Sequence, residues 1–355
     1  MNSKPPCTVL EDFILGAKGA RTVHAFAALA PGQPLQPWEY EPEPLGTGEV
    51  EIAVTHCGVC HTDLHLIENQ LGVETYPLVP GHEVIGTIAA VGATTGDLAI
   101  GRRVGVGFQR GACNQCEWCQ KGLPHLCAGL RPTALARYGG FAQRLRADHQ
   151  FAIPIPEALD SAVAAPLLCA GISVYAPLVR FVRPASRVGI IGIGGLGHLA
   201  LQFARAMGAE VFAFSTSREK QEEARRLGAH HFVDSTDPDQ MRHMTGSLDM
   251  LLSTVIVSLD WGIWLHTMRP NGTVCLVGVP PEPASLPVWP AMIMGQLSFC
   301  GSAIGTPLQI EEMLRFAALH NIRTAVEVMP MEHVNVALEK VRKNQARYRI
   351  VLAAH

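Results

Sequence analysis

Four cysteines with the spacing of metal ligands stand in one short stretch of this chain: Cys113, Cys116, Cys119 and Cys127. Thiolates bind zinc tetrahedrally at about 2.3 Å, and a short loop with four of them can enclose the ion without help from elsewhere. An iron–sulfur cluster is the competing interpretation, because Cys-x2-Cys-x2-Cys also suits clusters. Cysteine fills every position, so no ligand vacancy is left for a substrate. The spacing therefore predicts a lobe folded around a structural zinc.

The composition is typical of a compact enzyme. The 355 residues suffice for roughly two domains, with 48% hydrophobic and 17% charged residues. A net charge of -3 gives no reason to expect nucleic acid or an anionic membrane as partner. No apolar run approaches the ~20 residues of a membrane span. The 22 residues before Val23 lack the apolar core of a signal peptide, and we expect a mobile extension there. Ten cysteines without such a peptide favour metal ligands in a reducing compartment, the cytoplasm.

The pattern of strands and helices changes along the chain. Roughly the first 150 residues alternate short β-type runs with Gly and Pro punctuation, as in Glu49–Val54, Val84–Val91 and Arg103–Val106. A strand–helix series then follows, and it predicts an α/β, doubly wound parallel sheet with helices on both faces. Its strands are predicted at Arg187–Ile191, Glu210–Thr216, Leu248–Val255, Thr273–Val279 and Leu297–Ala303. The tail predicts an amphipathic helix around Ile310–Ala317 and a last strand at Tyr348–Leu352.

A glycine-rich turn follows the first strand of that series. It reads Gly192-Ile193-Gly194-Gly195-Leu196-Gly197 and opens a predicted helix that Gly208 ends. Between a strand and a helix, Gly-x-Gly-x-x-Gly is the fingerprint of a dinucleotide site. The glycines let the backbone approach a pyrophosphate, and the helix N-terminus supplies N–H donors.

The end of the second strand indicates which nucleotide binds. Chains that bind NAD tend to place Asp or Glu there, for the ribose 2′-hydroxyl. Here the strand ends in Ser215-Thr216-Ser217-Arg218-Glu219-Lys220, with hydroxyls and two cations that suit a 2′-phosphate. Glu219 falls after the turn, where an acid equally suits the first turn of a helix. The stretch therefore predicts NADP.

Three more motifs contain possible metal ligands, and each is a weak signal by itself. They are Cys57-Gly-Val-Cys60-His61-Thr62-Asp63-Leu64-His65, Gly81-His82-Glu83 and Leu168-Cys169-Ala170-Gly171. A lone Gly-His-Glu is common, and a single Cys before Ala-Gly is usually a packed small residue. The pair Cys57 and Cys60 also fits a redox Cys-x-x-Cys motif.

Taken together and in this order, the motifs resemble those of the zinc-containing medium-chain alcohol dehydrogenase/reductase superfamily. The resemblance covers nearly the whole chain from Val23, and it is strongest to the cinnamyl-alcohol-dehydrogenase group. The matching stretches are Cys57–His65, Val79–Val84, the four-cysteine lobe, Ala165–Gly171 and Gly192–Gly197. The resemblance implies two domains. A GroES-like β-rich catalytic domain would comprise residues 1–164 and 305–355, with the zinc lobe at 113–127, and a Rossmann NADP-binding domain would comprise 165–304.

The resemblance also implies an open catalytic zinc site. Its ligands would be Cys60, His82 and Cys169, with Glu83 able to approach the metal when water leaves. Two thiolates and a neutral imidazole leave zinc a Lewis-acidic fourth position, which polarises a carbonyl or acidifies an alcohol. Asp63 is expected to orient His82, because metal-bound imidazoles usually donate their other N–H. Cys57 falls outside this site.

Proton transfer is predicted at Thr62 and His65. Thr62 lies two residues past Cys60, where a hydroxyl can take the proton of the substrate alcohol. The resemblance implies that His65 continues the relay toward solvent, and the pKa of a histidine near neutrality suits that role. Loop-cap and surface positions suit the same two residues. The resemblance adds further cofactor contacts at Ser173, Thr254, Gly278, Ser302, Ala303 and Ile304, with His61 and Arg349 near the pyrophosphate.

Several positions depart from the pattern of the cinnamyl-alcohol-dehydrogenase group. The segment between the lobe and Cys169 is shorter than in typical members. Phe108 stands where plant members often have a cysteine that lines the substrate cleft, and its larger ring would narrow that cleft. Gln70 replaces an acidic residue and would reroute the proton path, while Ser173 replaces a threonine. A strictly cinnamyl substrate is therefore not predicted.

These features predict an enzyme with two zincs per subunit. It would use NADP(H) to interconvert primary alcohols, aromatic or aliphatic, and aldehydes by hydride transfer. The resemblance implies a homodimer formed through edge strands of the Rossmann sheets. One alternative is an NAD-dependent polyol or secondary-alcohol dehydrogenase of the same superfamily. The other is a non-catalytic binding protein on a dehydrogenase fold.

Overall fold

The computed structural model describes residues 22–354 apart from 71, 73 and 136–137. Its contacts divide the chain into two units. One consists of Met1–Cys169, Thr306–Leu314 and Ala325–His355, and the other of Ala170–Gly305 and Arg315–Thr324. The mobile extension expected before Val23 lies, except for Thr22, outside the described residues.

The segment Arg315–Thr324 was predicted in the catalytic domain but belongs to the second unit. Aromatic packing explains its place, because the Phe316 ring lies 5.7 Å from that of Tyr175 and 6.2 Å from that of Phe203. Gln202 also exchanges two hydrogen bonds with the backbone of Arg323, at 3.0 and 3.1 Å. The helix containing Phe316 therefore has residues in both units.

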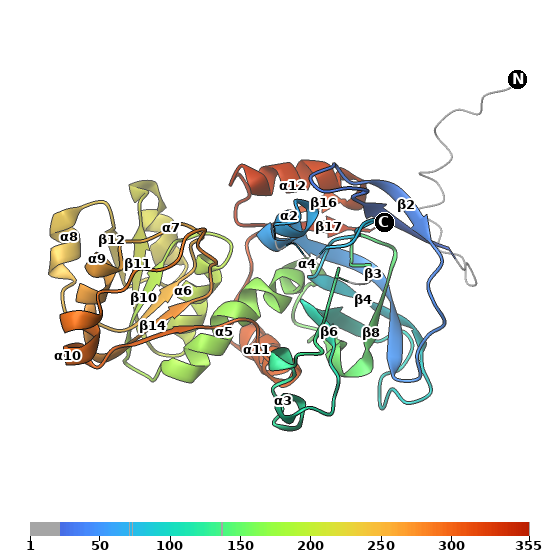
Figure 1. The fold of residues 1–355 in the computed structure, drawn as a ribbon, viewed down its shortest axis with the longest axis horizontal. Helices are drawn as coiled ribbons and strands as arrows, with labels where there is room; N and C mark the ends of the chain where they lie inside the picture. The colour runs from blue at the N-terminus through green and yellow to red at the C-terminus, as the bar shows by residue number, and fades with distance from the viewer. Residues whose placement is uncertain (1–21, 71, 73, 136–137, 355) are drawn as a thin grey trace, which may run out of the picture. The chain divides into compact units, whose positions relative to one another are not determined.

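A seven-stranded, largely antiparallel sheet forms the centre of the first unit, in the order β16-β17-β3-β4-β5-β9 with β8 paired to β3 (Figure 1). Its strands are β3 (Glu49–Val59), β4 (Val84–Val91), β5 (Arg103–Val106), β8 (Arg144–Asp148), β9 (Ile153–Pro154), β16 (Val326–Pro330) and β17 (Arg349–Ala353). Two smaller sheets pair β1 (Val23–Ala27) with β2 (Gln36–Tyr40), and β6 (Gln109–Gly111) with β7 (Arg131–Pro132). Along β3, buried Val50, Ile52 and Val54 alternate with half-exposed residues. One face of this sheet therefore packs on the core.

The helices of the first unit are short. They are α2 (His61–Ile67), α3 (Glu117–Gln120), α4 (Ser161–Ala164) and α12 (Val334–Arg342), with 3-10 turns η1 (Pro124–Leu126), η2 (His149–Phe151), η3 (Ala165–Leu168) and η6 (Met331–His333). On α12 the residues Val334, Ala337, Leu338 and Val341 are buried, which is one face of a helix. That helix packs against α2 and β3. It thereby supports the segment that follows Cys60.

The second unit contains one six-stranded sheet in the order β12-β11-β10-β13-β14-β15, and all its neighbouring strands are parallel. Its strands are β10 (Arg187–Ile191), β11 (Glu210–Ser215), β12 (His231–Asp234), β13 (Leu248–Ser253), β14 (Met268–Leu276) and β15 (Ser298–Gly301). In β10 and β11 every residue after the first is buried, as expected for strands covered on both faces. The predicted parallel sheet is thus confirmed.

Helices alternate with the strands of this sheet (Figure 1). They are α5 (Ala170–Phe181), α6 (Gly197–Ala206), α7 (Gln221–Arg226), α8 (Pro238–His243), α9 (Trp261–His266) and α10 (Ile293–Gly295), with short turns η4 (Arg218–Lys220) and η5 (Val288–Met292). The helix that has residues in both units is α11 (Pro307–Leu319). Within the described part of the chain, no single helix has the length and apolarity to span a membrane. One bent pair, Ser161–Leu168 with Ala170–Phe181, meets that test by length and composition when taken together.

Most predicted strand bounds agree with the structure, and β4, β5 and β10 match at both ends. The errors are larger elsewhere: β12 was not predicted, β3 ends at Val59 instead of Val54, and β14, which was predicted from Thr273, begins at Met268. Pro270 and Gly272 lie just before that predicted start. The structure instead places them within the strand, where the register against β13 shifts between Leu248 and Met250.

Candidate active site and nucleotide-binding turn

Four side chains of metal-ligand type converge in the first unit. The ligand atoms of Cys60, His82, Glu83 and Cys169 all lie within 4.8 Å of one another. They come from three separate segments: one follows β3, one precedes β4, and one follows η3. The antiparallel register, which pairs Cys57 with Val84, brings the first two segments side by side. We call these four residues the buried cluster.

Asp63 joins two segments of the buried cluster. Its Oδ2 accepts a hydrogen bond from the backbone N–H of Cys60 at 2.9 Å, at the start of α2. Its Oδ1 accepts from the backbone N–H of Gly81 at 3.0 Å and lies 2.9 Å from Nδ1 of His82. A carboxylate only accepts, so Nδ1 of His82 is the donor in this contact, and Nε2 is the ring nitrogen left for another partner.

The Nε2 atom of His82 is buried and has no hydrogen-bond partner among the described residues. Buried polar atoms are almost always paired, so an unpaired one indicates a missing ligand. An imidazole that donates through Nδ1 to a carboxylate and keeps Nε2 for an ion is the usual arrangement of a metal-binding histidine. The buried cluster therefore fits a metal ion.

The turn before His82 requires glycine. Gly81 has φ +97°, in the left-handed region, and a Cβ there would lie 2.7 Å from the backbone nitrogen of Phe141. A larger residue would be strained and would also push Phe141 away. This close packing aims the Gly81 N–H at Asp63, so the glycine supports the geometry of the whole cluster.

Glu83 is held by a buried ion pair. Its Oε1 pairs with Nη2 of Arg349, the first residue of β17, while its Oε2 has no partner among the described residues. Burial raises the pKa of the Glu83 carboxyl to about 7, although the Arg349 charge opposes that rise. Removal of one member of a buried pair typically costs ~3–5 kcal/mol. Arg349 therefore restrains Glu83 and leaves its second oxygen beside the cluster.

The two thiols of the buried cluster interact, since their sulfur atoms lie within 4.8 Å of each other. This side-chain interaction lowers the pKa of Cys60 well below its usual range and raises that of Cys169 well above it. The interaction therefore favours a thiolate at Cys60. A thiolate is the form that binds a metal ion.

Helix α2 places Thr62 and His65 on its partly exposed side, while Asp63 and Leu64 are buried. The Thr62 Oγ1 lies 3.7 Å from Sγ of Cys60, so the hydroxyl borders the cluster. His65 lies one helical turn further on, with its ring 6.1 Å from that of His61. Proton transfer from Thr62 to His65 stays a prediction.

Phe108 and Gln70, two of the positions that depart from the group's pattern, each make a defined contact. The Phe108 ring meets the His82 ring edge to face, with centroids 5.7 Å apart. It therefore occupies space next to the buried cluster. Gln70 donates a hydrogen bond to Glu68 at 2.6 Å, at the exposed end of α2.

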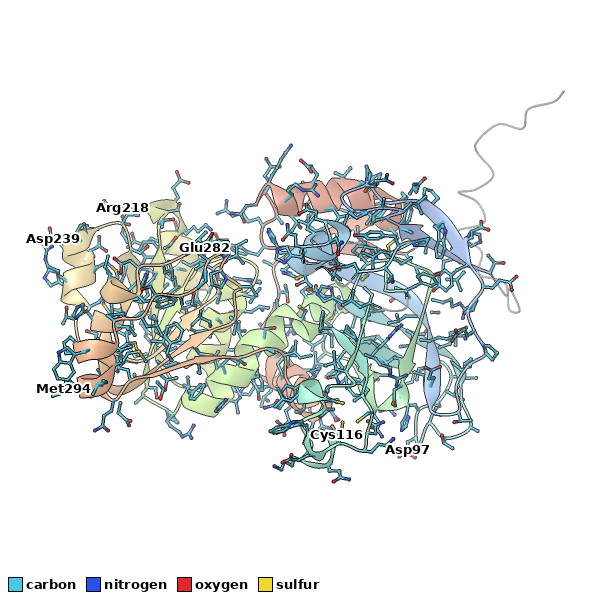
Figure 2. All side chains as sticks on the ribbon, viewed as in Figure 1. Asp97, Cys116, Arg218, Asp239, Glu282 and Met294 are labelled. Atoms are coloured by element: carbon cyan, nitrogen blue, oxygen red, sulfur yellow. The ribbon has the colours of Figure 1, made fainter. Side chains whose placement is uncertain are left out.

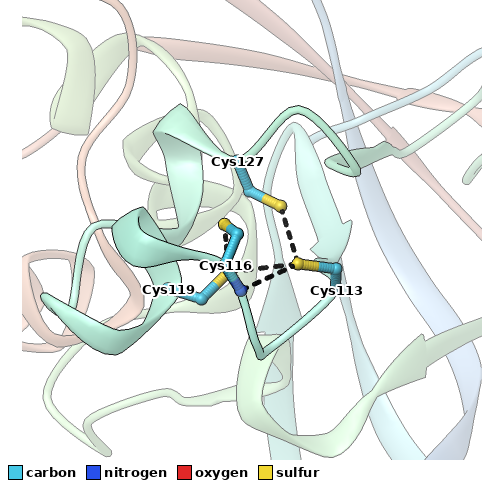
Figure 3. Close-up of side chains that lie close together, drawn as sticks. All are labelled: Cys113, Cys116, Cys119 and Cys127. Carbon is cyan, nitrogen blue, oxygen red and sulfur yellow. Dashed lines mark hydrogen bonds between the residues drawn. The ribbon is translucent and has the colours of Figure 1, made fainter.

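The predicted four-cysteine lobe also converges (Figure 3). The sulfur of Cys113 lies 3.4 Å from that of Cys127 and 4.0 Å from that of Cys119, which lies 3.6 Å from that of Cys116. A tetrahedron with arms of about 2.3 Å has edges of about 3.8 Å, close to these separations. The backbone N–H of Gly129 donates to Cys127 Sγ at 3.2 Å. Backbone N–H donors lower the pKa of Cys113 to about 6. We call these four residues the cage.

In the second unit, the glycine-rich turn joins β10 to α6. A Cβ at Gly197 would lie 1.8 Å from the Gly192 carbonyl oxygen, so the turn closes only around glycine. A Cβ at Gly194 would meet nothing within 4 Å, which leaves the outer side of the turn open. Lys220 donates to the Ile193 carbonyl at 2.8 Å. This open turn at the start of a helix fits a pyrophosphate.

The other predicted cofactor residues of this unit lie at strand ends or on α5. Thr254 follows β13, and its hydroxyl donates to the Ile191 carbonyl at 2.9 Å, so it supports the turn. Ser302 follows β15 and donates its N–H to the Leu276 carbonyl at 3.0 Å. The remaining residues of this set are Ser173 on α5, Gly278 after β14, and Ala303 and Ile304 after Ser302. His61 and Arg349 belong to the first unit.

The stretch after β11 is the predicted phosphate site. Ser215 is buried and accepts the N–H of Ser217 at 3.1 Å, whereas Thr216 is exposed. The Arg218 side chain is 71% exposed (labelled in Figure 2), yet its Nε lies 2.5 Å from a carboxylate oxygen of Asp234. The sequence did not predict this ion pair.

Two models of known protein families match the chain. Residues 46–157 match the alcohol dehydrogenase GroES-like domain, and residues 195–318 match the zinc-binding dehydrogenase domain. The chain belongs to the zinc-containing medium-chain alcohol dehydrogenase/reductase superfamily. Its first unit is the GroES-like part, and its second is the Rossmann part.

Comparison with relatives indicates the group within the superfamily to which this dehydrogenase/reductase belongs. An aldehyde reductase of Synechocystis sp. is 45% identical over 93% of this chain and 98% of its own length. A cinnamyl alcohol dehydrogenase structure from Sorghum bicolor has a TM-score of 0.89 and 37% identity, covering 94% of this chain and 98% of that one. The structure of CAD from Helicobacter pylori complexed with NADP(H) has a TM-score of 0.86 and 28% identity, with the same coverage. The chain is therefore a cinnamyl-alcohol-dehydrogenase-like alcohol dehydrogenase/aldehyde reductase.

Two contacts of this dehydrogenase/reductase were not predicted: the Glu83–Arg349 pair and the Asp234–Arg218 pair. Asp234 ends β12, and Arg218 follows the neighbouring strand β11. Arg349 begins β17, whereas Glu83 precedes β4, which lies on the other side of β3. In the sequence, each of these pairs was visible only as a charged residue beside an apolar run. Such a residue indicates an ion pair only once the order of the strands shows which partner lies next to it.

Proposed function

We propose that this dehydrogenase/reductase depends on zinc and uses NADP(H) to interconvert primary alcohols and aldehydes, with aldehyde reduction favoured when NADPH is abundant. The observation that carries the proposal is the buried cluster, in which two thiols, an imidazole and a carboxyl converge around an unpaired His82 Nε2. The aldehyde reductase of Synechocystis sp. supports the direction of the reaction.

The donor atoms decide which residues would hold zinc. Cys60, His82 and Cys169 would bind the catalytic ion, and Glu83 could reach it through Oε2 while Arg349 holds Oε1. Three protein ligands and one open position are the usual set of a catalytic zinc site. The cage would hold a second, structural ion. Its sulfur separations suit a single ion, whereas a four-iron cluster would hold its cysteines farther apart.

Residues of the chain would orient the ligands and move the proton. When bound, zinc supplies Lewis acidity and NADP(H) supplies or accepts the hydride. Asp63 keeps the His82 ring in the tautomer that presents Nε2 to the cluster. The Thr62 hydroxyl would take the proton of the alcohol during oxidation and return it during reduction, and His65 would pass it toward solvent.

NADP(H) is supported by the residues after β11. Ser215, Thr216 and Ser217 offer hydroxyls, and Arg218 and Lys220 offer cations, where an NAD-binding chain would carry a carboxylate. The Helicobacter pylori CAD complexed with NADP(H) supports the same choice. Gly192, Gly194 and Gly197 would receive the pyrophosphate at the start of α6.

We also propose a homodimer formed at the β15 edge of the Rossmann sheet. β15 has a strand partner on one side only among the described residues. The segment just before it exposes apolar side chains, with Trp289 67% and Met294 68% exposed. A second copy would cover this apolar surface and pair the strand edge. Size-exclusion chromatography with light scattering should give the mass of two chains. A cytoplasmic location stays a prediction.

A kinetic screen with metal analysis tests the main proposal. Aromatic, aliphatic and branched aldehydes would be reduced with NADPH and, in parallel, with NADH. We expect two zincs per chain and a much higher kcat/KM with NADPH. A strong preference for NADH would contradict the choice of cofactor. A protein with one zinc per chain and no activity on any aldehyde would be a binding protein on this fold.

A further inference from the structure

The last residues of β11 and β12 lie side by side. The parallel register pairs Ser215 with Asp234, the final residue of each strand. NAD-binding chains use an acid at the end of the strand corresponding to β11. In this chain the acid stands one strand further along the sheet. This acid, Asp234, contacts Arg218, so its carboxylate is not available to bind the ribose 2′-hydroxyl.

Asp234 is itself held in place on both oxygens. Its Oδ1 accepts from the backbone N–H of Thr236 at 2.9 Å and from the Thr236 hydroxyl at 2.6 Å. Its Oδ2 accepts from Nε of Arg218 at 2.5 Å. The carboxylate is buried, whereas the Arg218 side chain is largely exposed. The fixed carboxylate of Asp234 thus holds one edge of the exposed Arg218 guanidinium through a hydrogen bond.

A second carboxylate supports the same edge. Nη2 of Arg218 lies 3.5 Å from Oδ2 of Asp237, while Oδ1 of Asp237 caps α8 by accepting the N–H groups of Asp239 and Gln240. A guanidinium has five N–H donors in a planar fork. Asp234 and Asp237 occupy the Nε and Nη2 side, and no further partner of Arg218 is found among the described residues. The Nη1 end is therefore directed away from both acids.

We propose that Asp234 is a positioning residue for cofactor specificity: it holds Arg218 so that its Nη1 end meets the 2′-phosphate of NADP(H). This inference rests on the proposed use of NADP(H). A free arginine loses much side-chain entropy when it binds, and a side chain that is already held loses less. Repulsion between Asp234 and the phosphate is weak, because the guanidinium lies between them and neutralises the carboxylate. The hydrogen bond from Arg218 also lowers the pKa of Asp234 to about 2, so the carboxylate stays charged at neutral pH.

The test compares two nucleotides that differ only in the 2′-phosphate. Adenosine 2′,5′-bisphosphate and adenosine 5′-monophosphate would be titrated into wild-type enzyme and Asp234→Asn by calorimetry. We expect Asp234→Asn to bind the bisphosphate about tenfold more weakly and the monophosphate equally well. In kinetics, KM for NADPH should rise by a similar factor while kcat and KM for NADH stay unchanged. Asp239→Asn is the matched control, because Asp239 is exposed and pairs with Arg242.

A second comparison repeats these titrations in an Arg218→Ala background. In that background, Asp234→Asn should not weaken bisphosphate binding any further, because the carboxylate supports binding only through Arg218. Unchanged monophosphate affinity shows that the nucleotide site is folded in each variant. If the wild type discriminates between the nucleotides and Asp234→Asn does so equally or better, the positioning role is wrong and the use of NADP(H) stands. If the wild type binds both nucleotides equally, both proposals are wrong.

Discussion

The cage and the buried cluster are both cysteine-containing sites of the GroES-like unit, but they are assembled in opposite ways. The cage takes all its ligands from one short stretch, Cys113–Cys127, and neighbouring backbone N–H groups contact its sulfurs. The buried cluster takes its ligands from three distant segments, which strand register and Asp63 bring together. Local spacing therefore builds the first site, and the tertiary fold builds the second.

The same difference separates their chemistry. Four thiolates complete a tetrahedron, so the cage would have no position for a substrate. The buried cluster has two thiols and one imidazole, and its fourth member, Glu83, is restrained by Arg349. A zinc ion bound there would therefore keep a fourth position open to exchange. We expect the loss of a cage ligand to affect stability, and the loss of a cluster ligand to affect turnover.

Replacement of Cys60 should give the largest effect. Cys60→Ser should lower kcat/KM on the order of 1,000-fold, because a Lewis acid contributes several kcal/mol and each 1.36 kcal/mol is tenfold in rate. Metal analysis should find one zinc instead of two, with an unchanged melting temperature. Cys57→Ser is the matched control, since that buried thiol contacts only the Gly58 carbonyl among the hydrogen bonds described. Full activity in Cys60→Ser would exclude Cys60 as a ligand.

Replacement of a cage ligand should lower the stability of the folded protein. Cys116→Ser should lose the other zinc and on the order of 4 kcal/mol of stability, which corresponds to a fall in Tm of about 10 °C. Below the transition, kcat per folded chain should stay close to that of the wild type. Cys300→Ser, a thiol outside both sites, should change neither property. A Cys116→Ser enzyme that melts normally but turns over slowly would reverse the roles of the two sites.

Replacement of Asp63 tests whether the buried cluster depends on the residue that orients its ligands as well as on the ligands themselves. Asp63→Asn should reduce zinc affinity or activity by about 10–100-fold, because an amide can present a donor to His82 Nδ1 and favour the wrong tautomer. Competition with a chelator would measure the affinity. Asp97→Asn, an exposed acid of the same unit, should leave it unchanged. Unaltered zinc retention and turnover in Asp63→Asn would show that the three ligands alone fix the site.

The contrast also explains what could be predicted from the sequence. The cage followed from spacing alone, and the Rossmann sheet followed from apolar runs that alternate with helical patterns. The buried cluster depended on a family resemblance, because a lone Cys169 or His82 carries no local pattern. The Glu83–Arg349 pair was missed, since its partners come together only through the pairing of β17 with β3 and of β3 with β4. The start of β14 was missed because Pro270 and Gly272 resemble a turn, whereas the register shift beside β13 accommodates them.

The smallest effect is expected at Phe108, which should alter selectivity and leave the metal unaffected. The ring packs edge to face on His82, so it limits the room next to the buried cluster. Phe108→Ala should raise kcat/KM for a bulky aromatic aldehyde about fivefold relative to a short aliphatic one, in line with ~1 kcal/mol for a small change in pocket size. Phe108→Leu, closer in volume, should change the ratio less, and both variants should retain two zincs. An equal fall for all aldehydes would instead mean that the ring supports His82 and does not shape the space that receives the substrate.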